Sequence, residues 1–400
     1  MPMRRIAALA FSLTVLFLPL SASADPVRDR QYWLEDYGFS KAWSLTRGEG
    51  VVVAVIDTGI DASHPALRDT VIGGTDVSGL GSSDGLTPVG QNSYHGTLVA
   101  SIIAGQGNPL DQEAGVIGVA PGVKLLSVSM AFGVEDLDTD SQIAQGVIWA
   151  VDNGAQVINL SLTRNSTSWP KSWDAAFQYA FDNDVVIVAA TGNRVDGTES
   201  ISAPATIPGV ISVAGLDREG RASELSSLSG FTIALTAPSE DLVGAYPGGE
   251  YRIWQGTSGA APMVSGLVAL IRSEFPNMNA ANVINRVISS ANKAGFSGYS
   301  TAYGYGSIDA YSALTIELPI VSENPLGSLS QWVELYRAQS EVESGGIVSP
   351  IDDPIQELAQ AQPGFGPEML VPYALYAGLG ILALLLYFLF RPRSKPSTRK

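Results

Sequence analysis

Short, mainly apolar runs alternate along the middle of the chain with stretches whose apolar positions recur at helical spacing. The apolar runs cover residues 51–56, 124–130, 156–162, 185–190, 210–215 and 231–237, and the helical stretches cover residues 95–104, 140–153, 172–183, 258–274 and 280–291. A strand that is covered on both faces needs a nearly unbroken apolar run, and parallel strands are joined by crossover helices. The pattern therefore predicts an α/β fold with a doubly wound, mostly parallel sheet and helices on both of its faces.

Both ends of the chain carry apolar segments. Residues 1–24 contain two arginines, an apolar run over 6–20 and an Ala-Ser-Ala sequence at 22–24, which is typical of a cleaved secretory signal peptide. A retained membrane anchor is the alternative for this segment. Residues 370–390 carry no charge and are long enough to cross a bilayer as a transmembrane helix, with a buried core helix as the alternative.

A basic tail, residues 391–400, directly follows this second segment. Basic residues beside a membrane span stay in the cytoplasm, so we expect a single-pass protein of the cell membrane with residues 25–369 outside and the C-terminal tail inside. Residues 25–48 form a polar and aromatic N-terminal extension that we expect to pack along the main domain. Residues 316–369 are rich in Pro, Gly, Ser and Glu, and they are predicted to form a tether.

One stretch of this tether has apolar residues at positions 329, 332, 333 and 336, which is helical spacing. We expect it to pack on the main domain, with contact to a partner protein as the alternative. The chain contains no cysteine, which excludes disulfides, thiolate nucleophiles and cysteine-based metal sites. Its net charge of −16 argues against a nucleic-acid partner, because a duplex binder needs a basic face.

Polar residues with catalytic chemistry stand at the carboxyl ends of two predicted strands. Asp57 ends the first apolar run, and Asn193 follows the run over 185–190. In parallel sheets this edge is where ligands bind, although an aspartate can brace a loop and an asparagine can form a turn. His95 begins a predicted helix, whereas the second histidine, His64, precedes a proline and is expected to be structural.

The octapeptide at 256–263, Gly-Thr-Ser-Gly-Ala-Ala-Pro-Met, presents Ser258 at the start of an apolar helix. The helix N-terminus aims free N–H groups at whatever lies above the serine, which favours a developing oxyanion. Pro262 is expected in the first turn, where its missing N–H costs nothing, and residues 275–276 are expected to end the helix. A capped helix start without catalytic meaning is the alternative for this motif taken alone.

Together, four residues supply the parts of an acyl-transfer site. Ser258 would attack a carbonyl, and His95 would take its proton and pass it to the leaving amine. Asp57 would orient the imidazole and stabilise its charged form. The Asn193 side chain and the Ser258 backbone N–H would bind the oxyanion.

The sequences around Asp57, His95, Asn193 and Ser258 resemble the four signature blocks of the subtilisin-like serine peptidases, in the order that this family shows. The resemblance covers residues 49–315 and implies serine endopeptidase activity without a cofactor. It also implies that the substrate binds as an added strand. The implied substrate-binding residues are Ser129, Ala131, Gly133, Ser161, Leu162, Thr163, Ala190, Thr191 and Gly192.

Three positions depart from the family pattern. Thr163 and Arg164 replace a common glycine pair in the pocket wall, where a preference for a small or medium apolar side chain is expected. Gly259 replaces a bulkier residue after the nucleophile, which could loosen the turn. Ala66 stands where secreted members carry a calcium-binding aspartate, so that calcium site is expected to be missing, and no metal is predicted.

The order of segments resembles the mycosins, the membrane-anchored proteases of actinobacterial type VII secretion, although mycosins often carry cysteine pairs. We therefore predict a membrane-anchored endopeptidase that cleaves exported proteins at the outer face of the membrane. Its expected partners are a protein or peptide substrate, the membrane and a membrane secretion complex. The alternatives are a structural subunit of such a complex, with incidental proteolysis or none, and a general quality-control protease.

Overall fold

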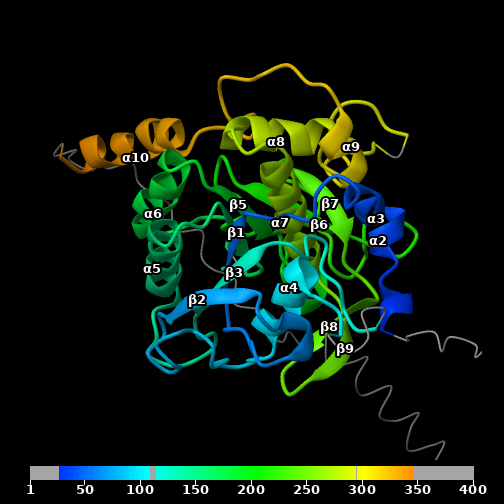
Figure 1. Cartoon of the computed structure of the whole chain (residues 1–400). Helices are drawn as coiled ribbons and strands as arrows, with labels where there is room; N and C mark the ends of the chain where they lie inside the picture. The colour runs from blue at the N-terminus through cyan, green and yellow to red at the C-terminus, as the bar shows by residue number, and fades with distance from the viewer. Residues whose placement is uncertain (1–26, 109–113, 165, 294, 346–400) are drawn as a thin grey trace, which may run out of the picture. The chain divides into compact units, whose positions relative to one another are not determined.

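A computed structural model describes residues 27–108, 114–164, 166–293 and 295–345 of the chain. The described residues up to Glu343 belong to one compact unit (Figure 1). The predicted signal peptide (1–24), transmembrane segment (370–390) and basic tail (391–400) lie outside the described residues. Within the described part of the chain, no helix combines the length and the apolar character needed to cross a membrane.

Seven parallel strands form the main sheet in the order β2-β3-β1-β4-β5-β6-β7. They are β1 (Val52–Asp57), β2 (Val71–Asp76), β3 (Lys124–Ser129), β4 (Val157–Leu160), β5 (Val186–Ala190), β6 (Ile211–Leu216) and β7 (Leu235–Pro238). The predicted parallel α/β sheet is confirmed. The edge strand β2 was not predicted, because Gly73 and Gly74 interrupt its apolar pattern. β7 begins later than predicted, because Phe231 is 87% exposed in the preceding loop.

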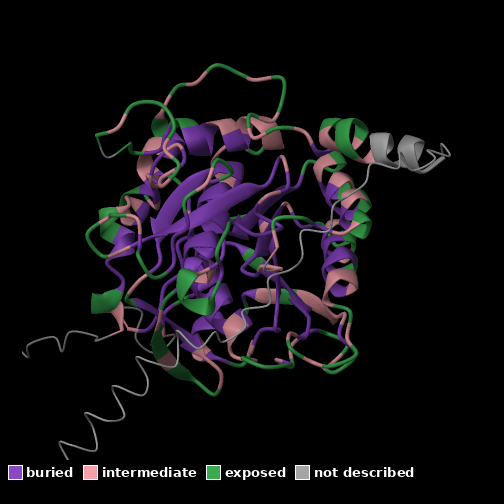
Figure 2. Ribbon diagram, turned by 180° about the vertical axis from the view of Figure 1, so that it is seen from behind, coloured by how far each residue is buried: buried purple, intermediate pink, exposed green. Residues whose placement is uncertain are grey.

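Helices cover both faces of the sheet, as the sequence pattern predicts. One face carries α4 (His95–Ala104), α7 (Thr257–Glu274), α8 (Ala280–Ser289) and α9 (Ala310–Thr315), and the other carries α5 (Thr139–Asp152) and α6 (Lys171–Asp182). Alternate residues of β1 point to opposite faces. Val53 and Val55 join the apolar cluster around α7, whereas Ala54 and Ile56 join the cluster with α5 and α6. Figure 2 shows the central strands coloured as buried.

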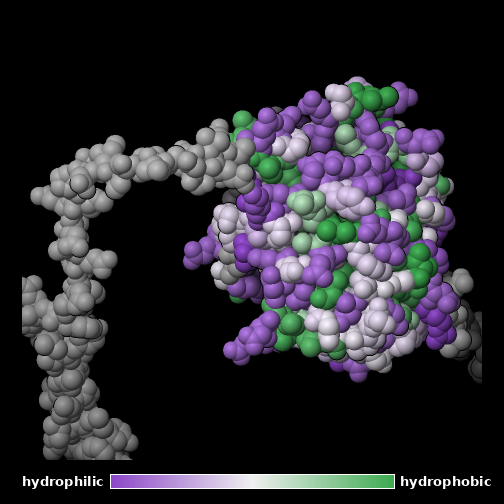
Figure 3. Space-filling view, turned by 90° about the vertical axis from the view of Figure 1, so that its left-hand side faces the viewer, coloured by the Kyte–Doolittle hydropathy of each residue, from purple (hydrophilic) through white to green (hydrophobic). Residues whose placement is uncertain are grey.

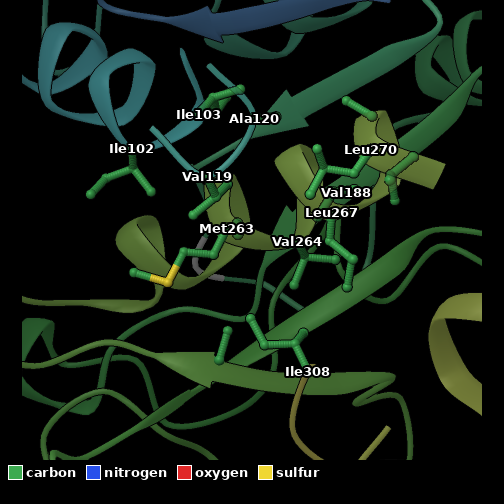
Figure 4. Close-up of a cluster of buried hydrophobic side chains, with 14 of the residues drawn as sticks. Ile102, Ile103, Val119, Ala120, Val188, Met263, Val264, Leu267, Leu270 and Ile308 are labelled. Carbon is green, nitrogen blue, oxygen red and sulfur yellow. The ribbon is translucent and has the colours of Figure 1, made fainter. Parts of the chain in front are cut away.

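The central helix α7 is buried along almost its whole length. Figure 4 shows Met263, Val264 and Leu267 of this helix beside Ile103 and Val119. A helix that is apolar on every side belongs inside a core, which explains why this segment shows no strong one-sided pattern. The core therefore fixes the position of the helix that begins beside Ser258.

The outer helices, by contrast, are amphipathic. In α6, Trp173 and Phe177 are fully buried, while Tyr179 is exposed. Figure 3 shows the side of the unit that carries α5 and α6, and its surface is mainly hydrophilic with small, separate hydrophobic patches.

The described part of the N-terminal extension packs into the main core. It forms η2 (Arg28–Arg30), α2 (Trp33–Asp36) and α3 (Phe39–Ala42). Trp33 and Phe39 are fully buried in the same apolar cluster as α7. The expectation that this segment packs along the main domain is therefore confirmed.

The predicted tether needs a correction over its first part. Residues 316–343 belong to the same compact unit as the preceding domain. Helix α10 (Leu329–Gly345) contacts the domain through Leu329, which is buried, and Trp332, whose ring centroid lies 4.4 Å from that of Trp169. The expectation that the apolar stretch at 329–336 packs on the main domain is confirmed, because a few large apolar side chains suffice to dock a helix. Residues 346–369 lie outside the described residues.

A two-stranded antiparallel hairpin lies between the sheet and α7 in the sequence. Its strands are β8 (Leu242–Tyr246) and β9 (Glu250–Trp254), joined by a turn in which Gly248 and Gly249 both have positive φ. Two consecutive residues of positive φ are typical of tight hairpin turns. The chain continues from β9 to Gly256 and the start of α7.

Candidate active site

Asp57 and His95 form a close pair at the carboxyl edge of the sheet. Asp57 is the last residue of β1 and is fully buried, and His95 is the first residue of α4. His95 Nδ1 lies 2.9 Å from both carboxylate oxygens of Asp57. This contact leaves Nε2 of the imidazole as the nitrogen that is not bound to the carboxylate.

The pKa of His95 is raised above its ordinary value of 6.5. Burial opposes the charged imidazolium, but the charge and hydrogen bond of Asp57 outweigh burial, and Asp196 adds a smaller effect. A carboxylate within hydrogen-bond distance stabilises the protonated ring. The site is therefore arranged to hold a proton on His95.

Ser258 is the second residue of α7, which begins after Gly256. Gly256 has φ 130°, and a Cβ there would lie 3.1 Å from Asn193 Nδ2, so only glycine fits this approach. Ser258 Oγ donates a hydrogen bond to the Ser161 carbonyl oxygen at 3.2 Å. The serine is thus held at the helix entrance.

The predicted position of Pro262 is wrong. Because α7 begins at Thr257, Pro262 lies in the second turn, where it removes the helical hydrogen bond to the Ser258 carbonyl. That carbonyl accepts a hydrogen bond from Ser161 Oγ instead, at 3.0 Å. Ser161 and Ser258 therefore hold each other through two hydrogen bonds, which ties the end of β4 to the start of α7.

Asn193 follows β5 and presents its side chain to the same place. Its Oδ1 accepts hydrogen bonds from the backbone N–H and the hydroxyl of Thr257, at 2.8 and 3.0 Å. These two bonds fix the orientation of the amide, so that its Nδ2 points away from Thr257. Nδ2 donates to Asp196 Oδ2 at 2.8 Å.

A cavity of about 350 Å³ joins these groups. His95, Asn193 and Ser258 line it, and Asp57 lies behind His95. The predicted substrate-binding residues that line it are Gly133, Ser161, Leu162, Thr163, Ala190 and Gly192. Arg164, next to this wall, forms two hydrogen bonds to the Asp140 carboxylate, at 2.7 and 2.8 Å.

Three predicted substrate-binding residues do not line the cavity. Ser129 is paired with Asp57 inside the sheet, and Ala131 is buried with its N–H bonded to Gln142. Thr191 is buried, and its N–H donates to Val213. Successive side chains of an extended segment point in opposite directions, so the neighbours of a lining residue can face the core.

Sequence reasoning missed seven residues of the cavity wall: Thr58, Gln91, Asn92, Phe132, Asp196, Thr198 and Thr257. Most belong to loops whose paths the apolar pattern does not define. For Asp196, the signal was its place three residues after Asn193 in the turn that follows β5. The turn carries the short helix η4 (Arg194–Asp196).

His64 has the structural role expected of it. Its Nδ1 accepts a hydrogen bond from the Ala66 N–H, which leaves Nε2–H to donate to the Glu250 carbonyl at 2.9 Å. Burial lowers the pKa of His64. Ala66 itself is fully buried, and among the described residues no group of three or more His, Cys, Asp or Glu side chains is arranged to hold a metal.

An aspartate on the first strand, a histidine on the next helix and a serine at the start of a late buried helix, on a parallel seven-stranded sheet, together define the subtilisin class of serine peptidases. The chain belongs to the subtilase family, since the Peptidase_S8 (Subtilase family) profile matches residues 48–306. It is accordingly a serine endopeptidase.

Individual relatives agree with this class. Fervidolysin of Fervidobacterium pennivorans is 34% identical over 69% of this chain, but the match spans only 42% of fervidolysin. Mycosin-3 of Mycobacterium tuberculosis is 35% identical over 70% of each chain. The solved structure of the MycP3 protease from the type VII (ESX-3) secretion system matches with a TM-score of 0.61 at 31% identity, over 75% of this chain and 91% of that one.

Proposed function

We propose that the protein cleaves exported proteins at the outer face of the membrane through an acyl-enzyme formed on Ser258. The observation that carries this proposal is the contact of His95 with both carboxylate oxygens of Asp57 in the cavity that Ser258 lines. A serine hydroxyl is a weak nucleophile unless an oriented base removes its proton. Asp57 and His95 supply that base.

In this mechanism Ser258 Oγ turns from the Ser161 carbonyl towards Nε2 of His95. His95 takes the hydroxyl proton during attack and later gives it to the leaving amine. Asp57 stabilises the imidazolium that forms between these steps. Asn193 Nδ2, which has a second hydrogen besides the one donated to Asp196, and the Ser258 backbone N–H hold the oxyanion.

The membrane and secretion parts of the proposal rest on other features. The apolar segments at 6–20 and 370–390, with basic residues after the second, support a single-pass protein whose peptidase domain is outside the cytoplasm. The similarity to mycosin-3 and to a protease from a type VII secretion system supports a role beside a secretion complex.

The test is labelling of intact cells with a membrane-impermeant, serine-directed fluorophosphonate. We expect one labelled band of this protein in the membrane fraction, and we expect Ser258→Ala to abolish it. Turnover of any peptide substrate should fall by about 10⁶-fold in the same variant, because the catalytic groups act as a unit.

Two outcomes would contradict the proposal. Labelling that appears only after the cells are lysed would place the domain inside the cytoplasm. Labelling or cleavage that survives Ser258→Ala would remove the nucleophile assignment. If Ser258→Ala cells secrete normally while cells without the protein do not, the structural-subunit alternative gains support.

A further inference from the structure

Asp196 brings a carboxylate into the cavity beside the amide of Asn193. It is an exposed residue at the end of η4, and its Oδ2 accepts the hydrogen bond from Asn193 Nδ2 at 2.8 Å. The same Nδ2 is the donor that the proposed mechanism assigns to the oxyanion. Asp196 therefore lies one hydrogen bond away from the place where the scissile carbonyl oxygen would bind.

The turn that carries Asp196 holds its shape without this side chain. Asp196 N–H and Thr198 N–H both donate to the Asn193 carbonyl, and Gly197 N–H donates to the Arg194 carbonyl. Gly197 has φ 79°, a conformation that glycine adopts without strain. The backbone groups of this turn therefore bond to one another, and the Asp196 carboxylate is not needed to hold the turn in shape.

No cation of the described residues neutralises this carboxylate. Apart from His95, Asp196 is the only titratable side chain among the described residues that line the cavity. The nearby Arg194 points elsewhere, since its guanidinium donates to the Ser227 carbonyl at 3.0 Å. None of the ion pairs recorded between described residues includes Asp196.

A lone carboxylate at this position opposes the reaction as the structure stands. It accepts one of the two N–H groups of the oxyanion donor and holds the amide in place, and its charge repels the negative charge that develops on the carbonyl oxygen. A cationic substrate side chain would remove both effects, because it pairs with the carboxylate and draws it away from Asn193.

We propose that Asp196 selects substrates with lysine or arginine at one of the residues that flank the scissile bond. Pairing of the basic side chain with Asp196 neutralises the charge beside the oxyanion and frees the Asn193 amide to align with it. This inference rests on the proposed function, because it assumes that the peptide is cleaved in this cavity.

The test compares pairs of fluorogenic peptides with the full-length chain. The two peptides of a pair differ at one residue, which is lysine in one peptide and norleucine, an uncharged analogue of similar length, in the other. This residue lies directly before the scissile bond in one pair and directly after it in the other pair. At one position we expect kcat/KM to be about tenfold higher for the lysine peptide than for the norleucine peptide. This is the effect expected of a partly exposed charge pair that raises the association rate and stabilises the transition state. Asp196→Asn should remove this preference and raise kcat for the norleucine peptide.

The matched control is Glu199→Gln, which removes an exposed carboxylate from the same loop that does not line the cavity. This variant should keep the lysine preference. Fluorophosphonate labelling of Asp196→Asn at or above the wild-type rate shows that its site is assembled, so a lost preference then reflects the lost charge.

A lysine preference that persists in Asp196→Asn, or no preference at any position in an enzyme whose cleavage depends on Ser258, would overturn the inference and leave the proposed function intact. Absence of any Ser258-dependent cleavage would overturn the proposed function. In that case binding of the fluorescent peptides to Ser258→Ala decides the inference separately, because equal affinity for the lysine and norleucine peptides would rule out recognition by Asp196.

Discussion

At the scale of single residues, the chemistry depends on how Asp57 and His95 share a proton. His95 is only partly exposed, with 23% of its side chain accessible, so water competes weakly with the carboxylate for the imidazole. The raised pKa means that neutral His95, the form that acts as a base, predominates only at a pH above that raised value. The raised pKa of His95 therefore lowers the activity at low pH, where the imidazole is protonated and cannot act as a base.

The first prediction concerns the acid limb of the pH profile. In the wild type, kcat/KM should rise with pH through a pKa above 6.5, as His95 loses its proton. In Asp57→Asn the limb should move to lower pH, because the charge that stabilises the imidazolium is gone, and kcat should fall by about 10⁴-fold. The measurement is kcat/KM from pH 5 to 9.

An acid limb at the same pH in both forms would show that Asp57 does not control the pKa of His95.

The Asp57–His95 pair also contributes to the stability of the folded protein, and the raised pKa fixes the direction in which this contribution changes with pH. The contribution is fully present below the ordinary pKa of histidine and is lost as pH rises through the raised value.

At the scale of elements, the β8–β9 hairpin supports the catalytic groups from one side. Trp254, the last residue of β9, meets the His95 ring edge-on, with ring centroids 5.9 Å apart and an interplanar angle of 83°. Its neighbour across the hairpin, Leu242, fills the space beside Gly259, where an added Cβ would lie 2.2 Å from Leu242 Cδ1. Gly259 thus gives Leu242 of the hairpin the space that a larger residue would take.

The second prediction is that Trp254 positions His95. Trp254→Ala should lower kcat by about tenfold with little change in KM, because a freed imidazole spends less time in line with Ser258. Trp254→Phe should restore most of the activity, since it keeps an aromatic edge at the ring. Steady-state kinetics on one peptide measures both.

The control for this prediction is Ile253→Ala, the adjacent β9 residue, which is 54% exposed and points away from the core. An equal loss in Ile253→Ala, or a loss confined to KM, would mean that the hairpin acts on substrate binding rather than on His95.

At the scale of the whole molecule, the N-terminal extension belongs to the core and not to the cleft. None of the described residues 27–48 lines the cavity, whereas Trp33 and Phe39 are fully buried with the α7 cluster. Gln31 adds two buried hydrogen bonds to Ile117, at 2.7 and 2.9 Å. This arrangement favours a stabilising role over an inhibitory one.

The third prediction follows from that placement. Trp33→Ala should lower the free energy of unfolding by about 3–5 kcal/mol, the usual cost of removing a large buried aromatic side chain. Labelling of Ser258 should not become faster. Denaturant unfolding and the labelling rate are measured on the same full-length preparation, with the exposed Ser44→Ala as control. Faster labelling at unchanged stability would instead show that the segment closes the site.

The sequence by itself determined the parallel α/β fold and the residues brought to its carboxyl edge. Short apolar runs that alternate with helical stretches favour strands covered on both faces, and a residue that follows such a run lies at the carboxyl edge of the sheet. For this reason Asp57 and Asn193 could be proposed before any geometry was known, whereas His95 and Ser258 were proposed from their places at helix starts and from the resemblance to the subtilisin-like peptidases. The predicted span of the buried helix, 258–274, agrees with α7, but the position of Pro262 in its second turn was not predicted.

Only the tertiary structure decided which neighbours these residues have. The Asn193–Asp196 bond, the Trp254–His95 contact and the docking of α10 on Trp169 join segments through loops and side-chain packing. Loop paths follow turn geometry and local hydrogen bonds rather than the apolar pattern. The sequence pattern records which side of an element is buried, but it does not record which residue lies against that side.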